Sequence, residues 1–231
     1  MHLKITGKYI VAFIALNFIM GELHEQAHIN TGFFICSCYG PRDFNVWSTC
    51  EDCPNASWAY IATLAGPLFS CTLMWLGAYW FSWSANENKR MIGFSLLFAN
   101  LPFARIFTAL VGGGDEKIVI QSLMNDNSNS FTSRIIASII VILVCLPPMI
   151  IAGRQIWNKN KWFIVVGFSV VPLIYGMLYQ RMFLNRLLKN DVLSATHILG
   201  TPDLVLLHFC LVLAILFVFQ KGIFELGANQ R

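Results

Sequence analysis

The amino-acid sequence predicts an all-α fold, a polytopic membrane helix bundle with about six transmembrane helices. The chain has 231 residues, of which 56% are hydrophobic and 12% charged, whereas a soluble domain carries roughly twice that charged fraction. Apolar segments close to the length needed to cross a bilayer, about 20 residues, also recur along the whole chain. We therefore expect an integral, multi-pass protein of a bacterial inner membrane or another cell membrane, with the lipid bilayer as a partner.

The predicted spans follow one another with short polar connections. They are Tyr9–Phe34, Ser57–Trp83, Met91–Val111, Ser133–Ala152, Trp162–Phe183 and Thr201–Phe219. The first segment runs into ionisable residues without a small-residue cleavage site, so we expect it to be retained as a helix. No connection is long enough for a separate soluble domain. The sequence therefore predicts a single integral membrane domain over residues 1–231.

The distribution of lysine and arginine predicts the orientation, because cytoplasmic loops carry an excess of these residues. With six spans, one side of the membrane receives Lys4, Lys8, Lys89, Arg90, Arg154, Lys159, Lys161, Lys221 and Arg231. The other side receives Arg42, Lys117, Arg134, Arg181, Arg186 and Lys189. This difference favours a cytoplasmic N-terminus. Because no basic patch interleaved with aromatic residues is present, we expect no nucleic-acid partner.

Residues 24–28 read His-Glu-Gln-Ala-His and follow directly on an apolar run. Positions i and i+4 share one face of a helix, so His24 and His28 can bind one metal ion. Glu25, between them, can act as a general base on a water that the metal activates. Ionisable side chains are costly inside a bilayer and mark functional sites there. We therefore predict zinc as the cofactor, bound by His24 and His28, with Glu25 as the catalytic residue.

A catalytic zinc site has three protein ligands and one open position, so a third ligand must come from another segment. The second and third spans both reach the membrane face at which His24 lies, and Gly-Gly-Gly-Asp-Glu at 112–116 follows the third span. The glycines allow the backbone to come close to a metal. We predict Asp115 as the third metal ligand, with Glu116 and then His208 as alternatives.

The order of these motifs resembles that of the site-2 protease family of intramembrane zinc metalloproteases. The His-Glu-x-x-His motif lies on the first span and Ala-Gly-Pro-Leu, residues 65–68, on the second. Asn100 and Pro102 lie on the third span, upstream of Asp115. The resemblance covers about residues 21–116, and its first motif is the most specific. The resemblance implies that His24, His28 and Asp115 bind the zinc and that Glu25 is the base, as the residue types also indicate.

The resemblance also implies a division of the chain. Residues 1–117 would form a catalytic core of three helices, and residues 118–231 would form three accessory helices. Gly66, Asn100 and Pro102 would position the substrate and the tetrahedral intermediate. The implied activity is hydrolysis of a peptide bond in a membrane protein or peptide substrate, within the membrane or at its edge.

The alternative interpretation is a membrane metalloprotein without protease activity. It would be either a degenerate protease homologue that binds membrane partners or a metal transporter. A transporter usually has repeated halves and further intramembrane ligands, and neither is evident in the sequence. A binding homologue would keep its function when Glu25 is replaced by glutamine, whereas a protease would keep its metal and lose turnover.

Two further ionisable residues fall inside the predicted spans. Arg105 must face the bundle or a water-filled cavity. There it would stabilise an oxyanion of the substrate or form an ion pair with Glu22 or another acid. Glu22 lies two residues before His24, about 200° around the helix, so we expect it to face away from the metal and to pair with Arg105 or another helix.

The first predicted loop contains four cysteines, Cys36, Cys38, Cys50 and Cys53. In an oxidising compartment they would form two disulfides, for which three connectivities exist. In the cytosol their thiolates could hold a second, structural metal ion. The predicted orientation favours disulfides. Either arrangement would fasten loop 36–53 near the metal motif, where it could act as a lid or substrate gate.

Overall fold

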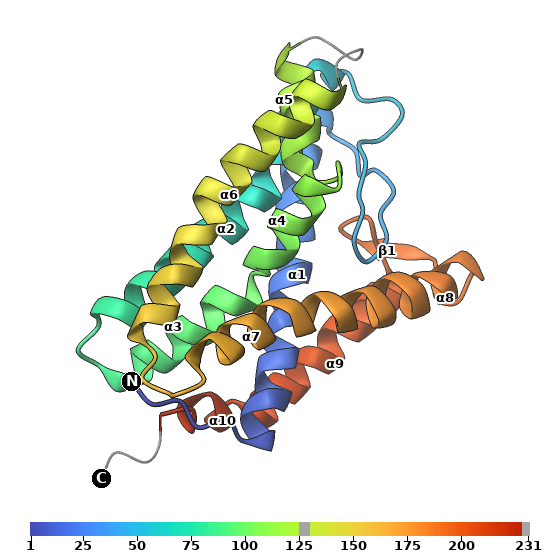
Figure 1. Ribbon diagram of the computed structural model, residues 1–231. Coiled ribbons are helices and arrows are strands. Elements are labelled where there is room, and N and C mark those ends of the chain that lie inside the picture. The colour runs from blue at the N-terminus through green and yellow to red at the C-terminus, as the bar shows by residue number, and fades with distance from the viewer. Residues whose placement is uncertain (125–129, 228–231) are drawn as a thin grey trace.

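The computed structural model describes residues 1–124 and 130–227, and nearly all of its regular structure is helical (Figure 1). The first half contains α1 (Gly7–Cys36), η1 (Ala56–Trp58), α2 (Ala59–Trp83), α3 (Glu87–Ala99), α4 (Pro102–Leu110) and α5 (Asp115–Met124). The second half contains α6 (Ser130–Gln155), α7 (Lys161–Tyr175), η2 (Gly176–Leu184), α8 (Asn185–Lys189), β1 (Thr196–Ile198), β2 (Thr201–Pro202), α9 (Asp203–Phe219) and α10 (Lys221–Phe224). The predicted helical class is confirmed.

Four helical stretches are long and apolar enough to cross a membrane. They are Ala56–Trp83, Glu87–Leu110, Ser130–Gln155 and Lys161–Lys189, and they coincide with the second to fifth predicted spans. α1 has 30 residues but carries four ionisable side chains in its second half, and α9 is apolar but has only 17 residues. A total of six spans therefore stays a prediction. The cytoplasmic location of the N-terminus also stays a prediction. Arg231, one of the basic residues that favoured it, lies outside the described residues.

α1 contacts four other helices, α2, α3, α9 and α10. Its N-terminus is capped by Thr6, whose hydroxyl accepts a hydrogen bond from the backbone nitrogen of Tyr9 at 3.1 Å. The Tyr9 ring is fully buried, and its hydroxyl lies 3.2 Å from Ser95 Oγ on α3. Phe94 of α3 and Phe168 of α7 pack edge to face nearby, with ring centroids 5.2 Å apart. These contacts hold α1 in a fixed register against its neighbours.

The third predicted span, Met91–Val111, is two helices rather than one. α3 ends at Ala99, Leu101 has a positive φ of 55°, and α4 begins with Pro102 in its first turn. Proline fits there because its missing N–H would have no partner within the helix. Asn17 of α1 donates from Nδ2 to the carbonyl oxygen of Ala99 at 2.7 Å. A side chain of α1 thus satisfies a backbone group that the break exposes.

The bundle has two distinct ends (Figure 1). At the N-terminal end, Leu3 N donates to Asn158 Oδ1 and Lys4 N donates to the carbonyl oxygen of Leu226, both at 2.7 Å. This end therefore joins the start of the chain, the α6–α7 turn and the segment after α10. α1 runs from there to the loop end, which contains loop 37–55 and α5. The ionisable half of α1 lies toward the loop end.

Candidate metal centre

The structure brings the three predicted ligands together. His24 and His28 lie one helical turn apart on α1, and their Nε2 atoms are 3.1 Å apart. Oδ2 of Asp115, at the start of α5, is 3.5 Å from His24 Nε2 and 3.6 Å from His28 Nε2. The potential ligand atoms of these three residues all lie within 4.8 Å of one another. Among residues 1–124 and 130–227, they are the group of His, Cys, Asp or Glu side chains close enough to share one metal ion.

The distances fit a metal ion with tetrahedral coordination. Around a zinc ion with bonds of about 2.0–2.1 Å, two ligand atoms lie about 3.4 Å apart, which is close to the three distances above. Two imidazole nitrogens and one carboxylate oxygen are also a donor set that zinc and other first-row metals accept. The group can therefore hold one ion and leave one coordination position open.

Hydrogen bonds to α2 orient both imidazoles. Nδ1 of His28 donates to the carbonyl oxygen of Ala62 at 2.8 Å. A carbonyl oxygen can only accept, so the proton lies on Nδ1 and the Nε2 lone pair is free. Nδ1 of His24 lies 3.0 Å from Ser70 Oγ. Metal-binding histidines commonly donate their second ring N–H, as His28 does here, and this fixes the ring orientation.

Gly66 allows α2 to approach the imidazoles. A Cβ at this position would collide with His28 Nε2, and it would lie 2.6 Å from His28 Cε1 and 2.7 Å from His24 Cε1. Any side chain here would occupy the space beside the donor atoms. The resemblance predicts that Gly66 positions substrate, and the structure places it directly against two of the ligands.

A glycine-rich turn delivers Asp115. Gly112 and Gly114 have φ values of 86° and 93°, conformations that L side chains rarely adopt, and α5 begins directly after them. Burial alone would raise the pKa of the Asp115 carboxyl, but its hydrogen bonds with His24 and His28 hold that pKa well below its usual range. Asp115 is therefore an anion that faces two imidazoles.

Glu116, the alternative third ligand, has a different partner. Its Oε1 accepts a hydrogen bond from Arg105 Nη1 at 3.0 Å. Arg105 thus forms the ion pair considered for it, but with Glu116 rather than with Glu22. The other terminal nitrogen of Arg105, Nη2, donates to His24 Nδ1 at 2.7 Å. The proton of a neutral His24 therefore lies on Nε2, and this hydrogen bond must be given up before Nε2 of the neutral ring can bind a metal ion. The Glu116 carboxylate therefore neutralises a cation that contacts a candidate metal ligand.

Glu25 lies beside the ligand group without being part of it. The side chain is buried, and among the described residues its Oε2 has no hydrogen-bond partner. Glu25 follows His24 directly on α1 and lies less than one helical turn before His28. A buried carboxylate oxygen of this kind is available to take a proton from a water molecule next to the metal site.

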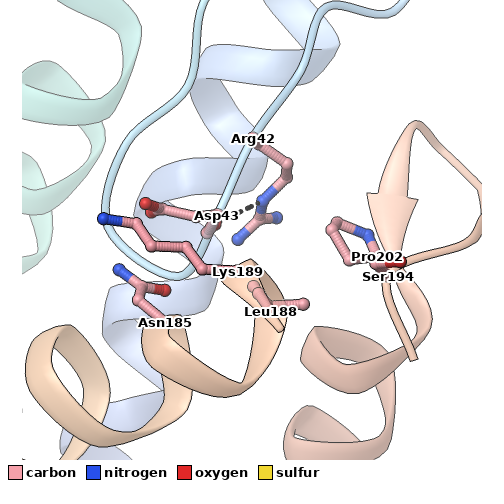
Figure 2. Close-up of a pocket in the computed structure, with 7 residues that line it drawn as sticks. All are labelled: Arg42, Asp43, Asn185, Leu188, Lys189, Ser194 and Pro202. Atoms are coloured by element: carbon pink, nitrogen blue, oxygen red, sulfur yellow. Dashed lines mark hydrogen bonds between the residues drawn. The ribbon is translucent and has the colours of Figure 1, made fainter. Parts of the chain in front are cut away.

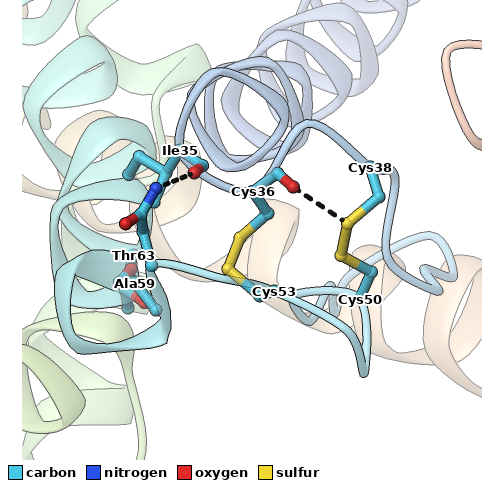
Figure 3. Close-up of a disulfide and its surroundings, with 8 residues drawn as sticks. Ile35, Cys36, Cys38, Cys50, Cys53, Ala59 and Thr63 are labelled. Carbon is cyan, nitrogen blue, oxygen red and sulfur yellow. Dashed lines mark hydrogen bonds between the residues drawn. A yellow bond between two sulfur atoms is a disulfide. The ribbon is translucent and has the colours of Figure 1, made fainter.

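Two disulfides close the loop that follows α1 (Figure 3). Cys36 is bonded to Cys53 and Cys38 to Cys50, with Cα atoms 4.6 Å and 6.1 Å apart. This nested pairing is one of the three connectivities that the sequence left open, and it replaces the alternative of a second metal site. The base of loop 37–55 is thus fixed at the C-terminal end of α1.

Trp47 of this loop covers one of the candidate ligands. Its ring is stacked on His28, with centroids 5.2 Å apart and planes inclined by 17°. Gly32, one turn beyond His28, leaves room for the indole, because a Cβ there would lie 3.1 Å from Trp47 Cζ3. The loop therefore lies over the metal motif, and its movement as a lid stays a prediction.

Arg42 fastens the loop to α1. Its guanidinium donates to both carboxylate oxygens of Glu22, at 2.8 Å and 2.9 Å, and its side chain is completely shielded from solvent. Bidentate pairs of this type are strong and geometrically specific. Glu22 thus pairs with a loop residue, so the expectation that it pairs with Arg105 or another helix is wrong.

The tip of the loop rests on η2, α8 and α9. The backbone nitrogen of Phe44 donates to Asn185 Oδ1 at 3.1 Å, and the Phe44 ring is buried against Leu184 and Val205. Beside this contact lies a cavity of about 200 Å³, whose lining includes Arg42 and Asn185 (Figure 2). The second half of the chain therefore supports the cover of the site.

Three predicted residues remain apart from the ligand group. Asn100 directly follows the last residue of α3 and donates from Nδ2 to the carbonyl oxygen of Leu96 at 2.7 Å, and Pro102 begins α4. The break that they flank is joined to α1 at Asn17, about 10 Å along the helix before His24. Their role in positioning substrate stays a prediction. His208 is buried among aromatic rings of α1, the loop and η2.

Sequence reasoning did not single out Ala62, Ser70 and Trp47 as neighbours of the ligands. Ala62 lies four residues before Gly66, and Ser70 lies four residues after it. The three residues therefore share one face of α2, and this spacing could have identified Ala62 and Ser70 from the sequence. Trp47 carries no comparable signal, because it lies in an irregular loop. Its position depends on how the disulfides and Arg42 hold that loop.

The fold and the site together define a membrane helix bundle with a partly buried candidate metal centre near its loop end. The centre combines three potential ligands, an adjacent carboxylate and a disulfide-bonded cover. Comparisons with protein-family models, with curated proteins and with solved structures return no match.

Proposed function

We propose that this protein is an intramembrane zinc metalloprotease that hydrolyses a peptide bond in a membrane-embedded or membrane-edge segment. The observation that carries the proposal is the convergence of His24, His28 and Asp115, with Glu25 on the same turn of α1. Three ligands and a nearby carboxylate are the parts that metal-assisted peptide hydrolysis needs. The surrounding apolar helices support a substrate that is itself a membrane segment.

The donor set suits a hydrolytic metal ion. His24 and His28 would bind zinc through neutral imidazoles, and Asp115 would contribute a single negative charge. The bound ion would therefore keep a net positive charge. Zinc, when bound, supplies Lewis-acid chemistry, because it polarises a carbonyl oxygen and makes a water molecule more acidic.

Glu25 would move the proton during hydrolysis. Its Oε2 accepts a proton from the water whose oxygen bonds to the peptide carbonyl carbon. When the C–N bond breaks, Oε2 returns that proton to the departing nitrogen, so the residue ends in its starting state. Trp47 and the disulfide-bonded loop would limit the entry of other water molecules while the substrate is bound.

Zinc content and cleavage, measured on the same samples, test the proposal. Protein purified in detergent should contain close to one zinc ion per chain by mass spectrometry. His28→Ala and Asp115→Ala should each lose it, because two remaining ligands bind zinc poorly. Glu25→Gln should keep the zinc and cleave quenched fluorogenic single-span peptides at least about 100-fold more slowly.

His208→Ala is the matched control, because it removes a buried histidine that lies outside the ligand group. It should leave the zinc content unchanged. Wild-type protein without zinc would contradict the proposal, and so would equal cleavage by wild type and Glu25→Gln. Stoichiometric zinc with no cleavage of any peptide would favour the non-proteolytic alternative. Zinc lost from His28→Ala but kept by Asp115→Ala would assign the third ligand elsewhere.

A further inference from the structure

We infer that the metal centre opens toward the oxidising, non-cytosolic side of the membrane, and that its substrates are membrane segments reached from that side. The orientation follows from the disulfides, the course of α1 and the basic residues. The statement about substrates rests in addition on the proposed protease function.

The disulfides place loop 37–55 in an oxidising compartment. Disulfides persist in the periplasm, the endoplasmic reticulum lumen and the extracellular space, whereas the cytosol keeps thiols reduced. All four cysteines of the loop and its edges are paired. The other cysteines, Cys71, Cys145 and Cys210, lie within helices and are free. Pairing is thus confined to the segment that covers the site.

The candidate ligands lie near that segment along α1. Cys36 follows His28 by eight residues, about 12 Å at 1.5 Å per residue, whereas Gly7 precedes His28 by about 32 Å. Trp47, from within the disulfide-bonded loop, is stacked on His28. The compartment that contains the disulfides is therefore the compartment nearest to the metal centre.

The basic residues indicate the same orientation. Hydrogen bonds join residues 1–4 to residues 155–158 and 226, and residue 227 to Met91. The segments that meet at this N-terminal end carry Lys4, Lys8, Lys89, Arg90, Arg154, Lys159, Lys161 and Lys221. Toward the loop end, Arg42 and Arg105 are neutralised by Glu22 and Glu116 in ion pairs inside the protein. Elsewhere Lys117, Arg134, Arg181, Arg186 and Lys189 are exposed or partly exposed. Eight such basic residues at the N-terminal end thus stand against five, and the positive-inside rule assigns the end with the larger number to the cytoplasm.

This orientation defines the substrate class. A peptide bond must reach donor atoms about 12 Å from the loop end of α1, so it has to be presented in the half of the bilayer that adjoins the oxidising compartment. We expect single-span or membrane-edge segments that unwind in that half, with the soluble fragment released to the same side.

Lysine labelling of the full-length protein tests the orientation without requiring activity. Lys189, near the tip of loop 37–55, is exposed, as are Lys89 and Lys159 toward the N-terminal end. In spheroplasts of a bacterial host, a membrane-impermeant amine reagent should label Lys189 before lysis. It should label Lys89 and Lys159 only after the membrane is permeabilised, and peptide mass spectrometry distinguishes the three sites.

Thiol trapping in the same cells provides a second readout. After acid quenching, the loop cysteines should react with a maleimide only when the sample has first been reduced. Labelling of Lys89 and Lys159 but not Lys189 in intact spheroplasts would overturn the orientation, and four free thiols in the loop would do so too.

Cleavage-site mapping separates the two proposals. Co-expressed single-span peptides of known orientation should be cut in their non-cytosolic half, and cuts confined to the cytosolic half would overturn the substrate class. If labelling and trapping give the expected pattern but no peptide is cut, the protease function fails while the orientation stands.

Discussion

Two segments outside the long helices reach the paired imidazoles, and they are held in different ways. Loop 37–55 covers His28 through Trp47, and it is fastened by two disulfides and by the Arg42–Glu22 pair. The glycine turn 111–114 delivers Asp115, and it adjoins the Arg105–Glu116 pair. One arginine–glutamate ion pair thus lies beside each segment, Arg42–Glu22 at the loop and Arg105–Glu116 at the glycine turn.

The difference between the two pairs lies in what the arginine contacts. Arg105 contacts the candidate ligand His24 at 2.7 Å, whereas Arg42 donates to Glu22 and to the backbone of its own loop. The Arg105–Glu116 pair therefore contacts the candidate metal centre, whereas the Arg42–Glu22 pair holds the loop that covers it. Stability of the cover and affinity for the metal should respond to separate substitutions.

The largest effect is expected from Arg42→Ala, which would break the cover. It leaves the Glu22 carboxylate buried without its charged partner, which costs about 3–5 kcal/mol of folding free energy. Thermal unfolding in detergent should show the loss, while zinc per chain in the folded protein stays unchanged. Replacing both partners, Arg42→Met with Glu22→Leu, should recover most of the stability. Loss of zinc without loss of stability would contradict the separation.

Glu116→Gln should act on the metal instead. Without the Glu116 carboxylate, the positive charge of Arg105 beside His24 is no longer neutralised. The contact by which Arg105 positions the His24 imidazole is then weaker. We expect the zinc dissociation constant to rise about 10–100-fold, measured by competition with a chromogenic chelator. Adding Arg105→Gln removes the cation and should restore part of the affinity. An unchanged dissociation constant in Glu116→Gln would show that the pair is not coupled to the centre.

Gly114→Ala tests the turn itself. Its φ of 93° is unfavourable for alanine, and the new Cβ would lie 3.1 Å from Glu116 Oε2. We expect a destabilisation on the order of 1–2 kcal/mol together with weaker zinc binding. Gly113→Ala is the matched control, since the atom nearest to its added Cβ is 3.6 Å away. Equal effects of the two substitutions would show that the turn conformation does not matter.

The smallest effect is expected from Trp47→Ala, which removes the stacked ring but no ligand. Zinc affinity should change little, whereas release of zinc to an excess of chelator should be about 2–10-fold faster, as expected for the loss of one aromatic contact. Trp83→Ala, at an exposed tryptophan of α2, should leave the release rate unchanged. A release rate that Trp47→Ala does not alter would show that Trp47 does not limit access to the centre.

Local spacing determined much of the site in advance. His24 and His28 share a helical face because four residues make about one turn, so their pairing needs only that α1 be helical. Asp115 was also expected from the sequence, because short connections return the third span to the same membrane face. The helical membrane class followed from composition alone, since hydrocarbon admits few charges and favours hydrogen-bonded helices.

Tertiary structure alone decided the partners of the charged groups and the role of Gly66. Glu22 and Arg42 are 20 residues apart, and Arg105 and His24 are 81 apart, so no local periodicity relates them. The disulfide connectivity and the break after Ala99 likewise depend on how the segments pack. Sequence specifies the faces that helices present, whereas contacts between distant segments are selected by the packing of the whole bundle.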